Sequence, residues 1–397
     1  MIPGFGAPSG GADPEGRAPM VGELVLPVLL GAFGVFGLFW GAFAVLLADL
    51  SGALDLTPGP LGVALFAGAA SSILAMAILG WTSDRLGRRL FLVVSGSLMG
   101  LGIAALAFVG GYAALFGALI VLYAASGLYD VGINAAAVDL EKATERRFMA
   151  LLHATFSAGA VVGALSAGAM LFAGVDYRYV YLALLPPLGA VVLSMAATRL
   201  PPPGGPREDA TRDSGLYRNL PLLLIAVIAT LALLSEGEME HWSGIYLRQT
   251  LGLSALLGGS AVAVFYGSMA VGRLGAAFVI GRLGNRRTLQ GAGLLAACGL
   301  ALALATREPL LVVAGFLVVG LALSAVVPIA FSVAGDLAPE RAGGAVSVVT
   351  TLGYGGFLMG PVIVGGLAEV LSLRIALGII GIAGSLIFVL ASRLKIR

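Results

Sequence analysis

The chain has 397 residues, of which 59% are hydrophobic and only 11% are charged, and its formal net charge is +2. Soluble proteins carry about a quarter charged residues, so this composition excludes a soluble fold and indicates an integral membrane protein. The small net charge gives no reason to expect nucleic acid as a partner. The single cysteine, Cys298, excludes an intrachain disulfide and a cysteine-based metal cluster.

Apolar runs of membrane-spanning length dominate the chain. A helix needs roughly 20 apolar residues to cross the hydrocarbon core of a bilayer. Runs of this kind predict twelve helices, at 24–48, 58–80, 90–109, 112–140, 149–173, 178–198, 220–247, 254–281, 288–306, 309–336, 343–369 and 373–392. Glycines are frequent inside these runs, where small residues let helices pack closely. We therefore expect an all-α integral membrane protein.

The segments outside these runs set the orientation. Residues 1–22 lack the pattern of a signal peptide and are expected to form a disordered cytoplasmic tail. Lys and Arg collect in the cytoplasmic loops of membrane proteins. With the N-terminus inside, most basic residues between helices fall in inner segments, and the exceptions are Arg178, Arg248, Arg307 and Arg374. Both termini are therefore expected in the cytoplasm, with the chain in a cell (inner) membrane.

The segment 199–219 divides the chain into two parts. It begins Arg-Leu-Pro-Pro-Pro-Gly-Gly-Pro, which cannot span a bilayer, and is predicted to be a cytoplasmic linker. On either side lie bundles of six predicted helices, at 23–198 and 220–392, and a short cytoplasmic tail follows at 393–397.

The two bundles resemble each other in sequence. The inner segment at 84–89 reads Asp-Arg-Leu-Gly-Arg-Arg, and its counterpart at 281–286 reads Gly-Arg-Leu-Gly-Asn-Arg. The pair Glu-Arg at 145–146 is echoed in the same way by Glu-Arg at 340–341. In both pairs the matching segments are separated by nearly the same number of residues, which indicates a tandem duplication.

This organisation, with the motif Gly-x-x-x-Asp-Arg-x-Gly-Arg-Arg at 80–89, resembles the major facilitator superfamily of secondary transporters. The resemblance covers about residues 23–392 and implies two six-helix bundles that rock about a central site near the membrane midplane. The stretch at 127–135, Gly-Leu-Tyr-Asp-Val-Gly-Ile-Asn-Ala, and the residues at 236–243 are similar to MosC-type and fucose-permease-like carriers.

The same resemblance separates uptake from efflux. Drug/proton antiporters of the superfamily carry a Gly-Pro pair in the fifth helix and an arginine in the fourth, whereas here the 149–173 helix has no proline and the 112–140 helix has no arginine. We therefore expect proton-coupled uptake of a small polar solute, such as a sugar or related metabolite. Proton-coupled efflux of drugs or other apolar compounds is the alternative.

Ionisable residues inside membrane helices are costly, so each is a functional candidate. Asp130 lies past the midplane of the 112–140 helix, toward the cytoplasm, with Asn134 one turn further along the same face. Partial desolvation favours the neutral carboxyl group, so Asp130 is predicted to carry the coupling proton. A permanent hydrogen bond or ion pair is the alternative. Further candidates for proton coupling are His153 and Glu236.

Substrate contacts are predicted for side chains that can hold a ring or a hydroxyl group, although packing is the alternative for each aromatic residue. These residues are Trp40, Tyr123, Asn134, Ser157, Glu236, Tyr266 and Tyr354. On the 220–247 helix, Glu236 is expected to face the cavity, and Glu238 or Glu240 is expected to serve an outer gate.

Charged residues at the inner ends of helices are candidates for gating. For Asp84 the resemblance implies contacts across the bundle interface in the outward-open state, with Arg146 as a plausible partner. The other gating candidates are Arg85, Arg88, Arg89, Glu141 and Arg273, with orientation in the membrane as the alternative role of the 85–89 arginines.

The remaining expectations concern partners and chemistry. The chain has no metal-ligand cluster, nucleophile elbow or phosphate-binding glycine loop, so we expect neither an enzyme nor a cofactor. The proton gradient is the expected energy source. The expected partners are a small-molecule substrate, protons and the lipid bilayer, and the protein is expected to work as a monomer.

Overall fold

The computed structural model describes residues 17–80, 82–201 and 216–394. In these ranges the chain is nearly all helical and contains no strand. The N-terminal half comprises α1 (Arg17–Ala53), α2 (Pro58–Leu79), α3 (Thr82–Leu86), α4 (Arg88–Ala107), α5 (Tyr112–Thr144), α6 (Met149–Phe172), α7 (Tyr177–Ala183) and α8 (Leu185–Ala197).

The C-terminal half begins with the short helix η1 (Leu216–Arg218). It continues with α9 (Leu220–Ile245), η2 (Tyr246–Thr250), α10 (Ala255–Ala305), α11 (Pro309–Leu323), α12 (Val326–Leu337), η3 (Pro339–Arg341), α13 (Ala342–Val370), α14 (Leu373–Ala376) and α15 (Gly378–Arg393). The expected all-α membrane protein is confirmed.

The structure refines the expected helix count. Eleven segments in the described ranges are long and apolar enough to cross a membrane, because α10 alone has 51 residues and covers the expected helices 254–281 and 288–306. Within α10, Gly284 has φ 75° and ψ 165°, which is not helical, so the chain turns there. α10 therefore accounts for two of the twelve expected crossings.

The expected boundaries at the ends and in the centre are only partly covered. α1 begins at Arg17, inside the expected tail 1–22, and residues 1–16 lie outside the described residues. Residues 202–215 of the expected linker and 395–397 of the expected C-terminal tail also lie outside them.

Two glycines occupy equivalent turns in the two halves. Gly87 has φ 80° between α3 and α4, and Gly284 has φ 75° inside α10. They are the glycines shared by the two copies of the repeated inner segment. Their ψ angles are 144° and 165°, and a positive φ with such a ψ is accessible essentially to glycine alone. The sequence repeat is therefore also a repeat of backbone conformation.

Gly284→Ala is expected to destabilise the protein by about 1–3 kcal/mol, because the methyl group strains this backbone conformation. Gly281→Ala is the matched control: Gly281 is helical, and a Cβ there meets nothing within 4 Å. That control is expected to be neutral or stabilising. The apparent Tm of the purified proteins in detergent measures both, and equal Tm values for the two variants would contradict the assignment.

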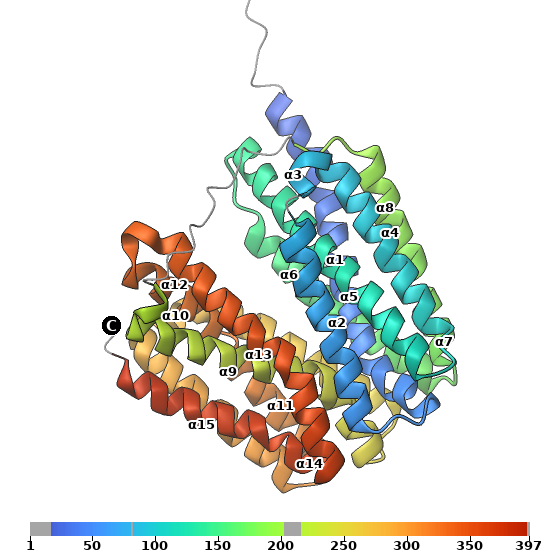
Figure 1. The fold of residues 1–397 in the computed structure, drawn as a ribbon, viewed down its shortest axis with the longest axis vertical. Helices are drawn as coiled ribbons and strands as arrows, with labels where there is room; N and C mark the ends of the chain where they lie inside the picture. Colours follow the sequence, from blue (N-terminus) through green and yellow to red (C-terminus); the bar gives the residue numbers. More distant parts are fainter. Residues whose placement is uncertain (1–16, 81, 202–215, 395–397) are drawn as a thin grey trace, which may run out of the picture.

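The two halves meet at one end of the molecule and diverge toward the other. Figure 1 shows them close together near α14 and apart toward α3 and α12. We call the side on which α1 begins and α15 ends the terminal face, and the other side the opposite face. Within each half, glycines permit close contact, for example between α1 and α6, where Gly41 and Gly163 lie against backbone of the other helix.

Polar contacts close the opposite face. The Arg248 guanidinium pairs with Asp49, and Gln249 Nε2 donates to the carbonyl oxygen of Ala48 at 2.9 Å. The backbone N–H of Gly59 donates to the Glu369 carboxylate at 2.8 Å. Each contact joins the N-terminal half to the C-terminal half at helix ends remote from the terminal face.

Candidate substrate cavity

A cavity of about 310 Å³ lies between the two halves. Its lining comes from α1, α2, α5 and α6 of the N-terminal half and from α9 and α13 of the C-terminal half. The lining residues are Phe33, Phe36, Trp40, Ala69, Ser72, Ile73, Met76, Tyr123, Ser126, Gly127, Asp130, His153, Phe156, Glu240, Tyr354, Phe357 and Leu358. Because both halves contribute, a movement of one half against the other changes the shape of the cavity.

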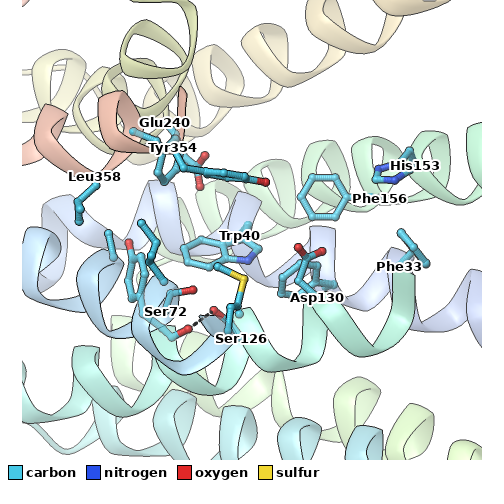
Figure 2. A pocket seen from close by; sticks show the side chains of 17 residues that line it. Phe33, Trp40, Ser72, Ser126, Asp130, His153, Phe156, Glu240, Tyr354 and Leu358 are labelled. Atoms are coloured by element: carbon cyan, nitrogen blue, oxygen red, sulfur yellow. Dashed lines mark hydrogen bonds between the residues drawn. The ribbon is translucent and has the colours of Figure 1, made fainter. Parts of the chain in front are cut away.

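Aromatic rings form much of the wall. The ring centroid of Trp40 lies 5.0 Å from that of Tyr123, in an edge-on arrangement, and Phe36 lies 5.6 Å from Phe156. Figure 2 shows Trp40 near the middle of the cavity, with Tyr354 across from it. Such rings offer flat, apolar faces on which a ring-shaped solute can stack, while the tyrosine hydroxyls offer hydrogen bonds.

Asp130 places a carboxylate in this cavity. The side chain of Asn134, one turn further along α5, donates to Asp130 Oδ1 at 2.9 Å and also to the Asp130 carbonyl oxygen at 2.9 Å. None of the ion pairs among the described residues includes Asp130. Asp130 therefore has a hydrogen bond to Asn134 and, within the described part of the chain, no ion pair.

Glu236 and Glu240 lie on nearly the same face of α9 and Glu238 lies on another, since successive helical residues are turned by about 100°. Glu236 forms an ion pair with Arg273 of α10 at 3.0 Å and is not part of the cavity lining. Glu240, one turn later, lines the cavity. Glu238 is fully buried beside Gly360 of α13. The placement differs from the expected one, in which Glu236 faces the cavity and Glu240 or Glu238 lies at an outer gate.

A hydrogen bond joins the two halves at the cavity. Tyr123 Oη and His241 Nε2 are 2.9 Å apart, and His241 Nδ1 lies 2.6 Å from the Gly237 carbonyl oxygen of its own helix. If Nδ1 donates to that carbonyl, Nε2 accepts from the tyrosine. Sequence reasoning missed His241 as a partner of Tyr123, because 118 residues separate the two.

Of the other residues predicted to lie at the cavity, some line it and others do not. His153 lines the cavity, with its ring 5.3 Å from that of Phe33. Asn134, Ser157 and Tyr266 are not part of the lining, and the Ser157 hydroxyl donates within α6 to the His153 carbonyl oxygen at 3.1 Å. Lining residues that sequence reasoning did not single out are Phe33, Phe36, Ala69, Ser72, Ile73, Met76, Ser126, Phe156, Phe357 and Leu358.

Sequence reasoning missed most of these because they look like ordinary membrane-helix residues. A phenylalanine in a membrane helix carries no signal that separates a cavity wall from a lipid-facing or packed position. The spacing of Phe33, Phe36 and Trp40 along α1 does place them on one helix face. That pattern fits a packed face equally well.

Near the terminal face, Arg88 is buried in an ion pair. Its Nε lies 2.7 Å from Asp139 of α5 and its Nη1 lies 2.7 Å from Ser83 Oγ. The side chains of Arg88 and Asp139 are only 9% and 4% exposed, whereas Arg89 is exposed. Sequence reasoning grouped Arg88 with the other gating arginines and did not single out Asp139.

Glu141, Arg85 and Arg146 are further gating candidates in the N-terminal half. Glu141 accepts from the backbone N–H of Met149 at 2.8 Å and so ties the end of α5 to the start of α6. Arg85 and Arg146 are exposed. The Asp84 side chain lies outside the described residues, so its gating role stays a prediction.

Sequence comparisons show the family. The Major Facilitator Superfamily pattern matches residues 28–307 and, separately, 245–397. An uncharacterized MFS-type transporter of Yersinia pestis is 31% identical over 359 residues, which cover 88% of this chain and 91% of that one. Membrane protein MosC of Rhizobium meliloti is 28% identical over 397 residues, 95% of each chain, in line with the expected MosC-type resemblance.

Solved structures share the fold at low sequence identity. The nucleoside transporter NupG superposes with a TM-score of 0.79 at 14% identity, covering 94% of this chain and 100% of that one. A bacterial homologue of the human lysosomal transporter Spinster, in an inward-facing and occupied conformation, gives 0.77 at 16% identity, with 97% and 98% covered. The family match and the Yersinia pestis relative, which is named an MFS-type transporter, confirm the expectation of a transporter and not an enzyme. The chain belongs to the major facilitator superfamily.

Proposed function

We propose that this protein takes up a small polar solute, such as a sugar or related metabolite, and that a proton gradient drives the uptake. The observation that carries the proposal is the cavity between the halves, which holds a carboxylate, Asp130, with no ion-pair partner among the described residues. An unpaired carboxylate inside a membrane is costly when ionised and can be neutralised by a proton. The proposal places the chain in the cell (inner) membrane, working as a monomer without a cofactor and with both termini in the cytoplasm.

Alternating access follows from how the halves are joined. On the predicted orientation the terminal face is cytoplasmic, so the arrangement with contacts at the opposite face is inward-facing. Opening the opposite face requires the Asp49–Arg248 pair and the Gly59–Glu369 hydrogen bond to break. The Tyr123–His241 bond, which also spans the halves, changes in the same movement. Rocking of one bundle against the other then exposes the cavity to the outside.

The cavity residues divide the work by their chemistry. Asp130 carries the proton, with Asn134 holding its carboxylate in place, and His153 lies on the same side of the cavity. Trp40 supplies a face for a ring, and the hydroxyls of Ser72 and Tyr354 are placed to bind solute hydroxyl groups.

Efflux of apolar compounds is the second candidate, and the aromatic wall of the cavity favours it. Phenylalanine rings from α1, α6 and α13 contribute to the lining, and they can hold a lipophilic compound without any hydrogen bond. The two candidates therefore differ in which part of the cavity provides most of the binding energy.

The test begins with thermal melting of the purified protein in the presence of sugars and other organic metabolites or of lipophilic cations. We expect the polar compounds to raise Tm. Proteoliposomes with and without a pH gradient then measure uptake of the stabilising solute. Stabilisation by lipophilic cations alone would favour efflux, and uptake that ignores the pH gradient would remove the proton coupling.

A further inference from the structure

The cavity contains two carboxylates, Asp130 and Glu240, in different surroundings. In Figure 2, Glu240 lies beside Tyr354 above Trp40, and Asp130 lies to the right of Trp40, toward His153. The carboxylates come from opposite halves of the protein, Asp130 from α5 and Glu240 from α9. A proton and a second positive group can therefore occupy the cavity together.

Glu240 lacks the counter-charge that its neighbour has. One turn earlier on α9, Glu236 is paired with Arg273 at 3.0 Å. No ion pair among the described residues includes Glu240, and none of the residues that line the cavity is Lys or Arg. The nearby His241 is already bonded through both ring nitrogens, to Tyr123 and to the Gly237 carbonyl oxygen. Among the described residues, Glu236 thus has a positive partner and Glu240 has none.

The aromatic wall next to Glu240 has the matching electrostatic character. The faces of Trp, Tyr and Phe rings carry negative potential and attract an ammonium group held within about 6 Å. Trp40, Tyr354 and Phe357 line the cavity together with Glu240. A carboxylate beside such faces favours a cation over a neutral solute and disfavours an anion.

We propose that the transported solute carries a protonated amino group, and that Glu240 is the residue that selects it, with the ring or carbon skeleton of the solute held against Trp40. This inference rests on the proposed function, because it names the chemical class of the solute that the same cavity carries. The ammonium group supplies the counter-charge that Glu240 lacks. A compact ring compound bearing one amino group is the class that meets these requirements.

Matched pairs of probes test the selection in binding experiments without a membrane. The pairs are cyclohexylamine with cyclohexanol and D-glucosamine with D-glucose, titrated against the purified full chain in detergent at pH 7. A charge-assisted hydrogen bond is expected to make the amine of at least one pair bind about tenfold or more tightly than its neutral partner. Equal or tighter binding of the neutral member in both pairs overturns the proposal, and this comparison needs no variant.

The Glu240→Gln variant assigns the preference to its residue. It keeps the shape of the side chain and removes the charge, so the preference for the amine is expected to disappear. Glu308→Gln, the same change at an exposed glutamate at the start of α11, is expected to keep the preference, because Glu308 lies outside the cavity lining. A preference that survives in Glu240→Gln, or that Glu308→Gln removes equally, overturns the assignment.

Transport assays separate this inference from the proposed function. A Glu240-dependent preference for amines without pH-driven uptake in proteoliposomes would support the binding site and contradict the transport proposal. Uptake of neutral sugars driven by a pH gradient, with no preference for amines, would overturn this inference and leave the proposed function standing.

Discussion

Asp130→Asn is expected to convert accumulation of solute into simple equilibration. A gradient of one pH unit is worth about 1.4 kcal/mol per proton, which supports about tenfold accumulation when one proton accompanies each solute. The asparagine keeps the size of the side chain and can still bond to Asn134, but it cannot take up a proton. In proteoliposomes with an imposed pH gradient, the variant is expected to bring the ratio of inside to outside solute to about one, without accumulation.

The control for this prediction is Asp176→Asn. Asp176 caps the start of α7 by accepting from the backbone N–H of Arg178 at 2.9 Å, and asparagine can make the same cap. It lies outside the cavity, so full accumulation is expected. Asp130→Asn would have to fold normally, as judged by its Tm, before its transport is compared. Full pH-driven accumulation by a well-folded Asp130→Asn would remove the residue from the coupling mechanism.

Arg88→Ala is expected to cause the largest loss of stability among single changes at the terminal face. Removing one partner of a buried ion pair typically costs about 3–5 kcal/mol, because a buried charge loses its compensation. Here the change takes the guanidinium away from both Asp139 and Ser83. The expected readouts are a marked fall in apparent Tm and a reduced yield of folded protein from membranes.

Arg89→Ala provides the matched control, since the neighbouring arginine is exposed. A surface substitution of this kind is expected to change stability by no more than about 0.5 kcal/mol. Arg88→Lys should recover only part of the loss, because an ammonium group cannot reproduce the planar, forked donors of the guanidinium. Equal Tm values for Arg88→Ala and Arg89→Ala would show that the buried pair does not stabilise the fold.

Burial also changes what Arg88 can do. In the sequence it stands between two other arginines and is naturally grouped with them as a charge that orients the chain in the membrane. In the structure it joins the starts of α3 and α4 to the end of α5, and it connects segments that are 51 residues apart. Any movement of α5 relative to α4 therefore acts on this pair.

The amino-acid sequence by itself determined the membrane-spanning segments and the repeat of the inner segment. Hydropathy and proline or glycine content can be read from each segment by itself. They are enough to predict a helix, because a segment in lipid must satisfy its own backbone hydrogen bonds. The repeated segment indicated a tandem duplication, and its shared glycines, Gly87 and Gly284, have nearly the same φ in the structure. The family resemblance was readable for the same reason, since its motif occupies one short segment.

Only the tertiary structure decided which side chains meet. The rotation of a helix about its axis is set by packing against its neighbours, so sequence alone could not choose which glutamate of α9 enters the cavity. In the structure Glu240 lines the cavity, and Glu236 forms an ion pair with Arg273. Likewise, the Tyr123–His241 and Arg88–Asp139 contacts join residues far apart in the chain, and no local pattern encodes such a pair.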